Sequence, residues 1–332
     1  MVVSSRNTDV GVRGLTVTQR LDMVPVLAGP DRVIEAIPGG LTNANYKVST
    51  GGHTYFARLS DPSSDLLAID RAAEHHNSVA AATAGVAPAV VAFVPEAGVL
   101  VIEWIDGRTL QPADLREQPT IHAVADACRR LHAGPRFASD FDMFQIQQRY
   151  FRTASDAGFR LPDRYVEFMP QLELIRTVLR RDAPLTLPCH NDLLAANFIA
   201  EGDRLWLIDY EYSGNNDPCF ELGNIWSESN LSADQLEELV SSYFGRRSAV
   251  LTARARLLAL MSQYGWTLWG VIQHNISELD FDFWSWAMEK YDRAVATFDS
   301  PDLAALLAAA ADHESPGYRH KEAVRDNNTR NE

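Results

Sequence analysis

The sequence contains few cysteines and no long hydrophobic run. Its three cysteines, Cys128, Cys189 and Cys219, lack the paired spacing of a structural metal site. An odd, sparse set predicts free thiols in a reducing cytoplasm rather than a disulfide framework. The longest apolar run, Leu303–Ala311, is far too short to cross a bilayer, and the charged N-terminal segment has no signal-peptide core. We therefore expect no membrane insertion and a cytoplasmic location.

Basic residues are scarce relative to acidic ones. The chain of 332 residues has 30 Lys and Arg against 44 Asp and Glu, which gives a formal net charge of −14 at pH 7. This surplus of negative charge argues against nucleic acid as a partner and is compatible with a cationic substrate. The length is sufficient for two lobes with a sizeable core.

The most informative stretch runs from Leu187 to Asp209. Within it, Asn197 lies five residues after Asp192, and Asp209 lies twelve residues after Asn197 at the end of a predicted strand over 204–208. Phosphoryl transfer from ATP needs a carboxylate that accepts the proton of the attacking hydroxyl and oxygen ligands that hold Mg²⁺. The pattern H-x-D-x4-N, followed by a strand-terminal Asp, supplies each of these groups.

Chemistry assigns a role to each polar residue of this stretch. Asp192 is the expected catalytic base, Asn197 and Asp209 are the expected Mg²⁺ ligands, and His190 is expected to brace the catalytic loop. Two alternatives stay open. The cluster is also compatible with a polar turn between two strands, because Asn and Asp are common turn formers. A two-metal phosphoesterase is the other alternative, although such sites usually need more histidine ligands.

HNDLLAANF at 190–198, followed by LIDYEYSGNNDPCFELGN at 207–224, resembles the choline/ethanolamine kinase family, within the aminoglycoside-phosphotransferase-like group of protein-kinase-like folds. The resemblance extends from Gly39 to Tyr291. It implies an α+β, two-lobed fold, with a small antiparallel-sheet lobe and a larger, mainly helical lobe. We place these lobes at 20–103 (nucleotide binding) and 104–312 (catalysis and acceptor binding), and we expect a disordered polar tail at 313–332.

The first lobe is expected to begin with a hairpin and a phosphate lid. Two glycines at 51–52 separate the alternating runs 46–50 and 53–59, which is a strong hairpin pattern. The preceding loop, 39–45, is rich in small polar residues whose backbone can approach a nucleotide. By the resemblance this loop covers ATP, and Asn43 is one of its hydrogen-bond donors.

Arg58 is a charged residue among apolar neighbours on the third predicted strand, so it is either solvated or held inward for a purpose. Protein kinases place a lysine here, which binds the phosphates and pairs with a helix glutamate. The resemblance implies that Arg58 takes this role and that Glu74, on a helix predicted over 66–84, is its partner. We expect Asp70 and Arg71 to face solvent, and an exposed Glu74 is the alternative.

The crossing between the two lobes is expected at residues 102–106. Strands are predicted over 86–94 and 98–104 on its N-terminal side. By the resemblance, backbone groups of Glu103, Trp104 and Ile105 meet the adenine.

The segment Met261–Tyr291 contains four of the seven tryptophans. A quaternary ammonium has no N–H donor, so its recognition depends on aromatic faces and nearby carboxylates. The family resemblance implies that the cationic head group of the acceptor is held by Glu228, Trp266, Trp269, Phe281 and Trp286. The alternative for the aromatic residues is core packing, which we expect for Trp284, and the alternative for Glu228 is an exposed position on a helix. Leu194 stands where the family often has a glutamine, which leaves the identity of the amino alcohol open.

These residues together predict a Mg²⁺-dependent kinase that transfers the γ-phosphoryl group of ATP to the hydroxyl of choline or a related amino alcohol. The expected partner is a small-molecule substrate, and the expected assembly is a monomer or homodimer. One alternative is an aminoglycoside phosphotransferase of the same fold, although the tryptophan cluster disfavours it. Another is a non-catalytic binding module for a quaternary ammonium ligand, which an intact set of three catalytic residues disfavours.

Overall fold

The computed structural model describes residues 14–60, 67, 69–181 and 183–312, so the predicted tail at 313–332 lies outside the described residues. The helices are α1 (Val17–Asp22), α2 (Arg71–Thr83), α3 (Gln118–His132), α4 (Met143–Asp156), α5 (Met169–Arg181), α6 (Pro218–Glu228), α7 (Ala233–Phe244), α8 (Ala249–Ile276), α9 (Phe283–Phe298) and α10 (Asp302–Ala310). The strands are β1 (Val33–Ile37), β2 (Asn43–Thr50), β3 (His53–Ser60), β4 (Val90–Val94), β5 (Val99–Glu103), β6 (Arg108–Thr109), β7 (Leu187–Cys189), β8 (Phe198–Glu201), β9 (Arg204–Leu207) and β10 (Gly214–Asn216).

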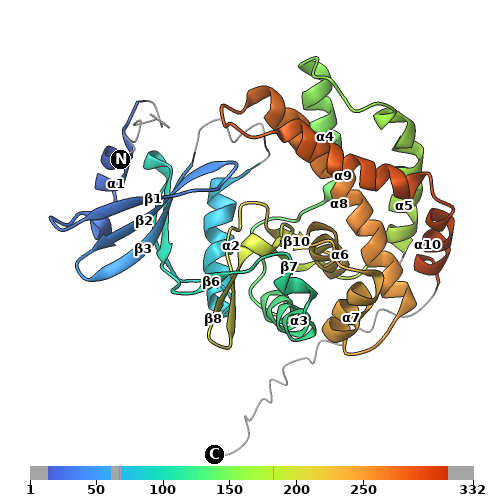
Figure 1. Ribbon diagram of the computed structural model, residues 1–332, viewed down its shortest axis with the longest axis horizontal. Helices are drawn as coiled ribbons and strands as arrows, with labels where there is room; N and C mark the ends of the chain where they lie inside the picture. Colours follow the sequence, from blue (N-terminus) through green and yellow to red (C-terminus); the bar gives the residue numbers. More distant parts are fainter. Residues whose placement is uncertain (1–13, 61–66, 68, 182, 313–332) are drawn as a thin grey trace, which may run out of the picture.

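A five-stranded antiparallel sheet forms the N-terminal part of the molecule, in the order β1-β2-β3-β5-β4 (Figure 1). The predicted hairpin between β2 and β3 is confirmed. Gly51 and Gly52 both have positive φ angles, 58° and 78°, which glycine adopts without a steric penalty and which match the twist of the flanking strands. Strand β2 begins at Asn43, so the end of the predicted loop 39–45 is already part of the sheet.

Two predicted elements differ from the structure. The helix expected over 66–84 begins only at Arg71, because the Asp70 side chain caps it by accepting the N–H groups of Ala72 and Ala73. The strand expected over 86–94 begins only at Val90.

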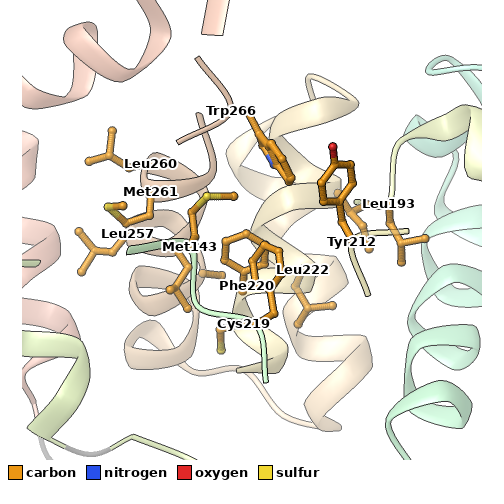
Figure 2. Packing of buried hydrophobic residues seen from close by; sticks show 14 of the residues in the cluster. Met143, Leu193, Tyr212, Cys219, Phe220, Leu222, Leu257, Leu260, Met261 and Trp266 are labelled. Carbon is orange, nitrogen blue, oxygen red and sulfur yellow. The ribbon is translucent and has the colours of Figure 1, made fainter. Parts of the chain in front are cut away.

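The C-terminal part is a helical assembly built around α8 (Figure 1). Its core contains side chains from α4, α6 and α8, among them Met143, Phe220 and Met261 (Figure 2). Helices α6 and α8 approach so closely that a Cβ atom on Gly223 would lie 2.2 Å from the carbonyl oxygen of Ala255. A glycine at this position is therefore a packing requirement. In the described part of the chain, no helix is both long and apolar enough to span a bilayer.

Two short strand pairs position the central segment. Strand β7 pairs with β10, and β8 pairs with β9, both antiparallel. The polar residues at 190–197 lie between β7 and β8. The segment 208–213 lies between β9 and β10, which are the pairing partners of those two strands. This pairing brings together two stretches that are separated by ten residues, 198–207, in the sequence.

Candidate active site

A cavity of about 550 Å³ lies between the N-terminal sheet and the helical part. It is lined by most of the residues singled out from the sequence. These are Asn43, Arg58, Glu103, Trp104, Ile105, Asp192, Asn197, Asp209, Glu228, Trp266, Trp269 and Trp286. Three other predicted residues do not line the cavity. His190 and Glu74 are buried behind the cavity wall, and Phe281 is exposed.

Asn197 is held by the backbone of the segment that precedes it. The side-chain Nδ2 of Asn197 donates to the backbone carbonyl oxygen of Asp192 at 2.8 Å. The backbone carbonyl oxygen of Asn197 accepts the N–H of Ile208 at 3.1 Å. Because the amide nitrogen is engaged in this way, the Oδ1 atom is the group of Asn197 that remains to act as a ligand. These two hydrogen bonds connect Asn197 to Asp192 and to Ile208, the residue that follows β9.

Asp192 is half-buried in the cavity wall. Burial of its carboxyl raises its pKa well above the usual range for aspartate, and the negative charges of Glu228, Asp209 and Glu211 add to this rise. A carboxylate with a raised pKa is a stronger proton acceptor than an ordinary surface aspartate.

Asp209, two residues after the end of β9, has an unusual backbone conformation with φ of 74°. A non-glycine residue in this region carries strain, and such residues cluster at functional sites. The side chain of Asp209 is 42% exposed, and one of its oxygens accepts a hydrogen bond from Nη1 of Arg58 at 2.6 Å.

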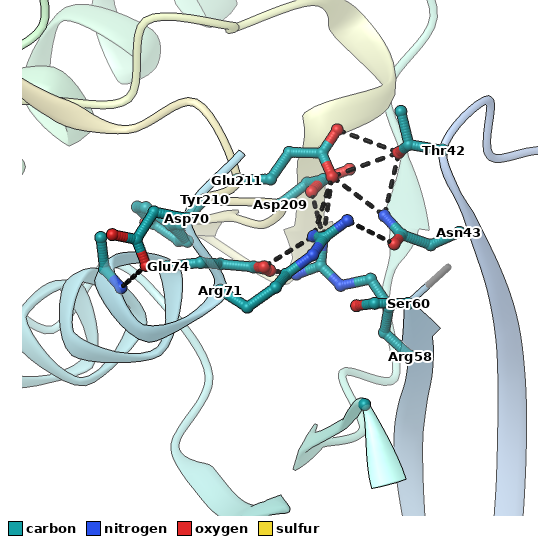
Figure 3. A network of polar contacts seen from close by, with 12 residues as sticks. Thr42, Asn43, Arg58, Ser60, Asp70, Arg71, Glu74, Asp209, Tyr210 and Glu211 are labelled. Carbon is teal, nitrogen blue, oxygen red and sulfur yellow. Dashed lines mark hydrogen bonds and ion pairs between the residues drawn. The ribbon is translucent and has the colours of Figure 1, made fainter. Parts of the chain in front are cut away.

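Arg58 is 6% exposed and also pairs with Glu74 on α2 (Figure 3). Burial alone would lower the pKa of Arg58, but the carboxylates of Glu74 and Asp209 raise it, so the guanidinium stays charged. A charged Arg58 thus lies in direct contact with Asp209 at the cavity wall.

Glu211 joins the loop at 39–45, named the glycine-rich loop after Gly39 and Gly40, to α2 (Figure 3). It accepts hydrogen bonds from Thr42 at 3.0 Å, Asn43 at 2.9 Å and Arg71 at 3.2 Å. Arg71 also donates to Glu74 at 2.8 Å. The expectation that Arg71 faces solvent is therefore wrong, because the late start of α2 turns its first residue inward. Burial, followed by the nearby Asp209 carboxylate, raises the pKa of Glu211 to about 7.

His190 is fully buried behind the cavity, and burial lowers its pKa, so the ring is neutral. Its Nε2 donates to the carbonyl oxygen of Ile208 at 2.7 Å, directly before Asp209. The neighbouring Asn191 has a positive φ of 67° and donates to the carbonyl oxygens of Tyr212 and Gly214, each at 3.2 Å. Both side chains connect the catalytic loop to the segment that carries Asp209.

Glu221 on α6 holds the backbone of the catalytic loop at His190 and Asn191. Its two carboxylate oxygens accept the backbone N–H groups of His190 at 2.9 Å and Asn191 at 2.7 Å. Burial alone would raise the pKa of Glu221, but its contacts with His132 and His190 lower it overall. A lowered pKa stabilises the folded chain at neutral pH, and this contribution is lost as the pH falls through the pKa of the folded state.

We expect Glu221→Ala to lower the free energy of unfolding by about 2–5 kcal/mol, because two buried backbone donors lose their acceptors. Urea unfolding measures this directly. Glu289→Ala, at an exposed position of α9, is the matched control and should change stability by less than about 0.5 kcal/mol. Equal stability of the two variants would show that Glu221 does not hold the loop.

Glu103, Trp104 and Ile105 line the end of the cavity where β5 leaves the sheet. The backbone N–H of Glu103 already donates to the carbonyl oxygen of Ala89 at 3.0 Å. The ammonium group of Lys47 lies 4.9 Å from the centre of the Trp104 ring.

The opposite end of the cavity is aromatic. Trp266 and Trp269 on α8 lie beside Tyr212, whose ring centre is 4.8 Å from that of Trp266. The indole N–H of Trp269 donates to the Tyr212 hydroxyl at 2.7 Å, and Trp286 on α9 lies 5.1 Å from Trp269. Tyr212 was not identified from the sequence, although its position three residues after Asp209 places it on the segment that returns through the cavity wall.

Phe281 and Trp284 lie away from this aromatic wall. Phe281 is 42% exposed, packs edge-on against Phe283 and is not among the cavity-lining residues, so the structure does not support its predicted place in the cage. It lies in the loop before α9, and the N-terminal capping of that helix by Asp282 turns Phe283 inward instead. Trp284 packs against the Arg160 guanidinium, as expected for a packing residue.

Glu228 lines the cavity at the end of α6, with its carboxylate held by Lys290 of α9. The Lys290 ammonium lies 2.6 Å from both carboxylate oxygens and 4.3 Å from the centre of the Trp286 ring. Lys290 was missed in the sequence, although its position four residues after Trp286 places both on one helix face.

Helix α8 also contacts the loop at 39–45. Gln273, four residues after Trp269, is buried and donates from Nε2 to the carbonyl oxygen of Leu41 at 3.1 Å. The helix that carries the tryptophans therefore touches the glycine-rich loop directly.

The chain is similar in sequence and in fold to known proteins. Residues 33–260 match the model of a family described as phosphotransferase enzyme family. The solved structure of a choline/ethanolamine kinase family protein from Mesorhizobium loti is 32% identical, covers 88% of this chain and 97% of its own, and superposes with a TM-score of 0.77. Protein LicA of Haemophilus influenzae is 26% identical over 77% of each chain. The structure of choline kinase LicA from Streptococcus pneumoniae, at 24% identity and a TM-score of 0.71 over 83% of this chain and 96% of its own, shares the fold.

Proposed function

Because the chain belongs to the phosphotransferase enzyme family, and within it to the choline/ethanolamine kinase family, we propose that it transfers the γ-phosphoryl group of ATP to the hydroxyl of choline or a closely related amino alcohol. The family and the two-lobed kinase-like fold class predicted from the sequence are thereby confirmed. The observation that carries the proposal for the site is that Asp192, Asn197 and Asp209 line one cavity together with an aromatic wall.

Asp192 is the proposed base. It orients the acceptor hydroxyl and accepts its proton as the oxygen attacks the γ-phosphorus. Burial raises the pKa of Asp192, and this upward direction makes its carboxylate a stronger proton acceptor. Glu221, His190 and Asn191 are positioning residues that hold the backbone of the loop and do not touch substrate.

The nucleotide is proposed to lie under the glycine-rich loop, within the lobe at 20–103. Its adenine would meet the backbone at Glu103, Trp104 and Ile105, and Asn43 would donate to the phosphates. Arg58 would bring its positive charge to the phosphates, and Glu74 fixes the guanidinium from behind. The lobe at 104–312 would supply the base and the acceptor site.

Asn197 and Asp209 are the residues proposed to hold Mg²⁺. Their donor set fits a hard cation, because one amide oxygen and one half-exposed carboxylate are oxygen ligands at the cavity surface. When bound, Mg²⁺ neutralises charge that develops on the phosphoryl oxygens. The Arg58 guanidinium donates to the same Asp209 carboxylate and keeps it at the cavity wall.

The acceptor head group is proposed to rest on Trp266 and Trp269. We expect Trp269→Leu, which removes the aromatic face but keeps apolar bulk, to raise the KM for choline about 2- to 30-fold with kcat largely retained, since a cation–π contact contributes about 0.5–2 kcal/mol. Steady-state kinetics with choline as the varied substrate gives this value. Trp284→Leu is the matched control on α9 and should leave KM near that of the wild type. Equal KM values for the two variants would remove the cage from the proposal.

The proposed activity is tested by measuring ADP release with a panel of acceptors that includes choline, ethanolamine, their methylated intermediates and aminoglycosides. Mg²⁺-dependent turnover with an amino alcohol, and none with aminoglycosides, is the expected result. ADP release that needs no acceptor, or that is fastest with an aminoglycoside, would overturn the proposal. The expected cytoplasmic location and a monomeric or homodimeric state remain predictions.

A further inference from the structure

The acceptor end of the cavity already contains an ammonium group of the protein. The side chains of Lys290 and Glu228 are 7% and 14% exposed, so this is a largely desolvated ion pair. The Lys290 ammonium has both partners expected for a cationic head group: a carboxylate at 2.6 Å and a tryptophan ring at 4.3 Å. An acceptor that enters the cavity meets this pair rather than a free glutamate.

Two other carboxylates of the cavity also accept hydrogen bonds from protein side chains. Asp209 accepts from Arg58, and Glu211 accepts from Thr42, Asn43 and Arg71. Glu103 lies at the end where β5 leaves the sheet, and Asp192 is needed by the acceptor hydroxyl. Among the described cavity residues, the aromatic side chains of Tyr212, Trp266 and Trp269 line the same cavity as Asp192 and can offer ring faces to a cation.

Resting on the proposed function, we propose that Lys290 is a specificity-determining residue. By holding Glu228, it restricts the acceptor's cation to aromatic faces and selects a methylated ammonium over a primary one. A primary ammonium carries three N–H donors that lose water on burial and need acceptors in return. A quaternary ammonium has no such donors and is stabilised by ring faces alone.

The test compares kcat/KM for choline and ethanolamine in the full-length enzyme and three variants. The wild type and Lys290→Arg, which keeps the cation, should both favour choline. Lys290→Met frees Glu228, and we expect it to shift the choline-to-ethanolamine ratio by at least about tenfold toward ethanolamine, because a charge-assisted hydrogen bond is worth that factor or more. The double variant Glu228→Gln with Lys290→Met removes the freed carboxylate and should return the ratio toward that of the wild type. An unchanged ratio in Lys290→Met, or a shift that persists in the double variant, would overturn the proposal.

A second readout does not depend on turnover or on the variants folding. Quenching of tryptophan fluorescence by tetramethylammonium and by methylammonium, measured on the wild type, should show tighter binding of tetramethylammonium. Equal or tighter binding of methylammonium would contradict the role of Lys290. Failure of the wild type to phosphorylate either alcohol would instead refute the proposed function, and the fluorescence comparison would still show whether the cavity binds a methylated cation more tightly than a primary ammonium.

Discussion

Replacing Asp209 with asparagine is expected to lower kcat by about a thousandfold or more while leaving the fold intact. The substitution keeps the size of the side chain but removes the only charge that this residue offers to a cation. Stabilisation of phosphoryl transfer by a bound metal is worth several kcal/mol, and each 1.36 kcal/mol corresponds to a factor of ten in rate. The side chain is 42% exposed, so its loss should change the melting temperature little.

The measurement is kcat at saturating ATP, choline and Mg²⁺, accompanied by a thermal melt of each protein. Asp203→Asn is the matched control, because Asp203 is exposed on the turn between β8 and β9, close in sequence but outside the cavity. It should retain wild-type activity. An Asp209→Asn enzyme with activity near that of Asp203→Asn would show that Asp209 does not hold the metal.

Asp192→Asn is expected to reduce kcat by about 10²–10⁴-fold, the usual contribution of a positioned general base. Nucleotide affinity should be nearly unchanged, because the proposed contacts to ATP come from other residues. The effect should therefore appear in kcat and not in the KM for ATP. This separates Asp192 from Asp209, for which we expect the Mg²⁺ dependence to change as well.

Asp156→Asn, at the exposed end of α4, serves as the control for the same chemical change elsewhere. Its kinetics should match those of the wild type. If Asp192→Asn instead raised the KM for ATP with kcat retained, the residue would belong to the nucleotide site and another group would have to accept the proton.

The parts of the fold that local chemistry specifies could be predicted from the sequence. The Gly51-Gly52 turn fixes the hairpin, because few other residues adopt its two positive φ angles. The spacing from Asp192 to Asp209 predicted residues that line one cavity, since short paired strands bring both ends of the stretch together.

Contacts between distant segments could not be predicted in this way. Arg71 looked solvent-facing because the start of α2 depends on the Asp70 cap, and its partner Glu211 lies 140 residues away. Lys290 and Glu228 are 62 residues apart on separate helices, so only their packing shows that the glutamate is already paired. For Phe281 the family resemblance implied a place in the cage, whereas the structure leaves this side chain exposed in the loop before α9.

The most direct test is a crystal structure with Mn²⁺ in place of Mg²⁺, a non-hydrolysable ATP analogue and choline, in which anomalous scattering locates the metal. We expect the metal peak within coordination distance of Asn197 Oδ1 and the Asp209 carboxylate, with the choline hydroxyl facing Asp192. A metal bound elsewhere, or an acceptor whose hydroxyl lies away from Asp192, would contradict the proposed site.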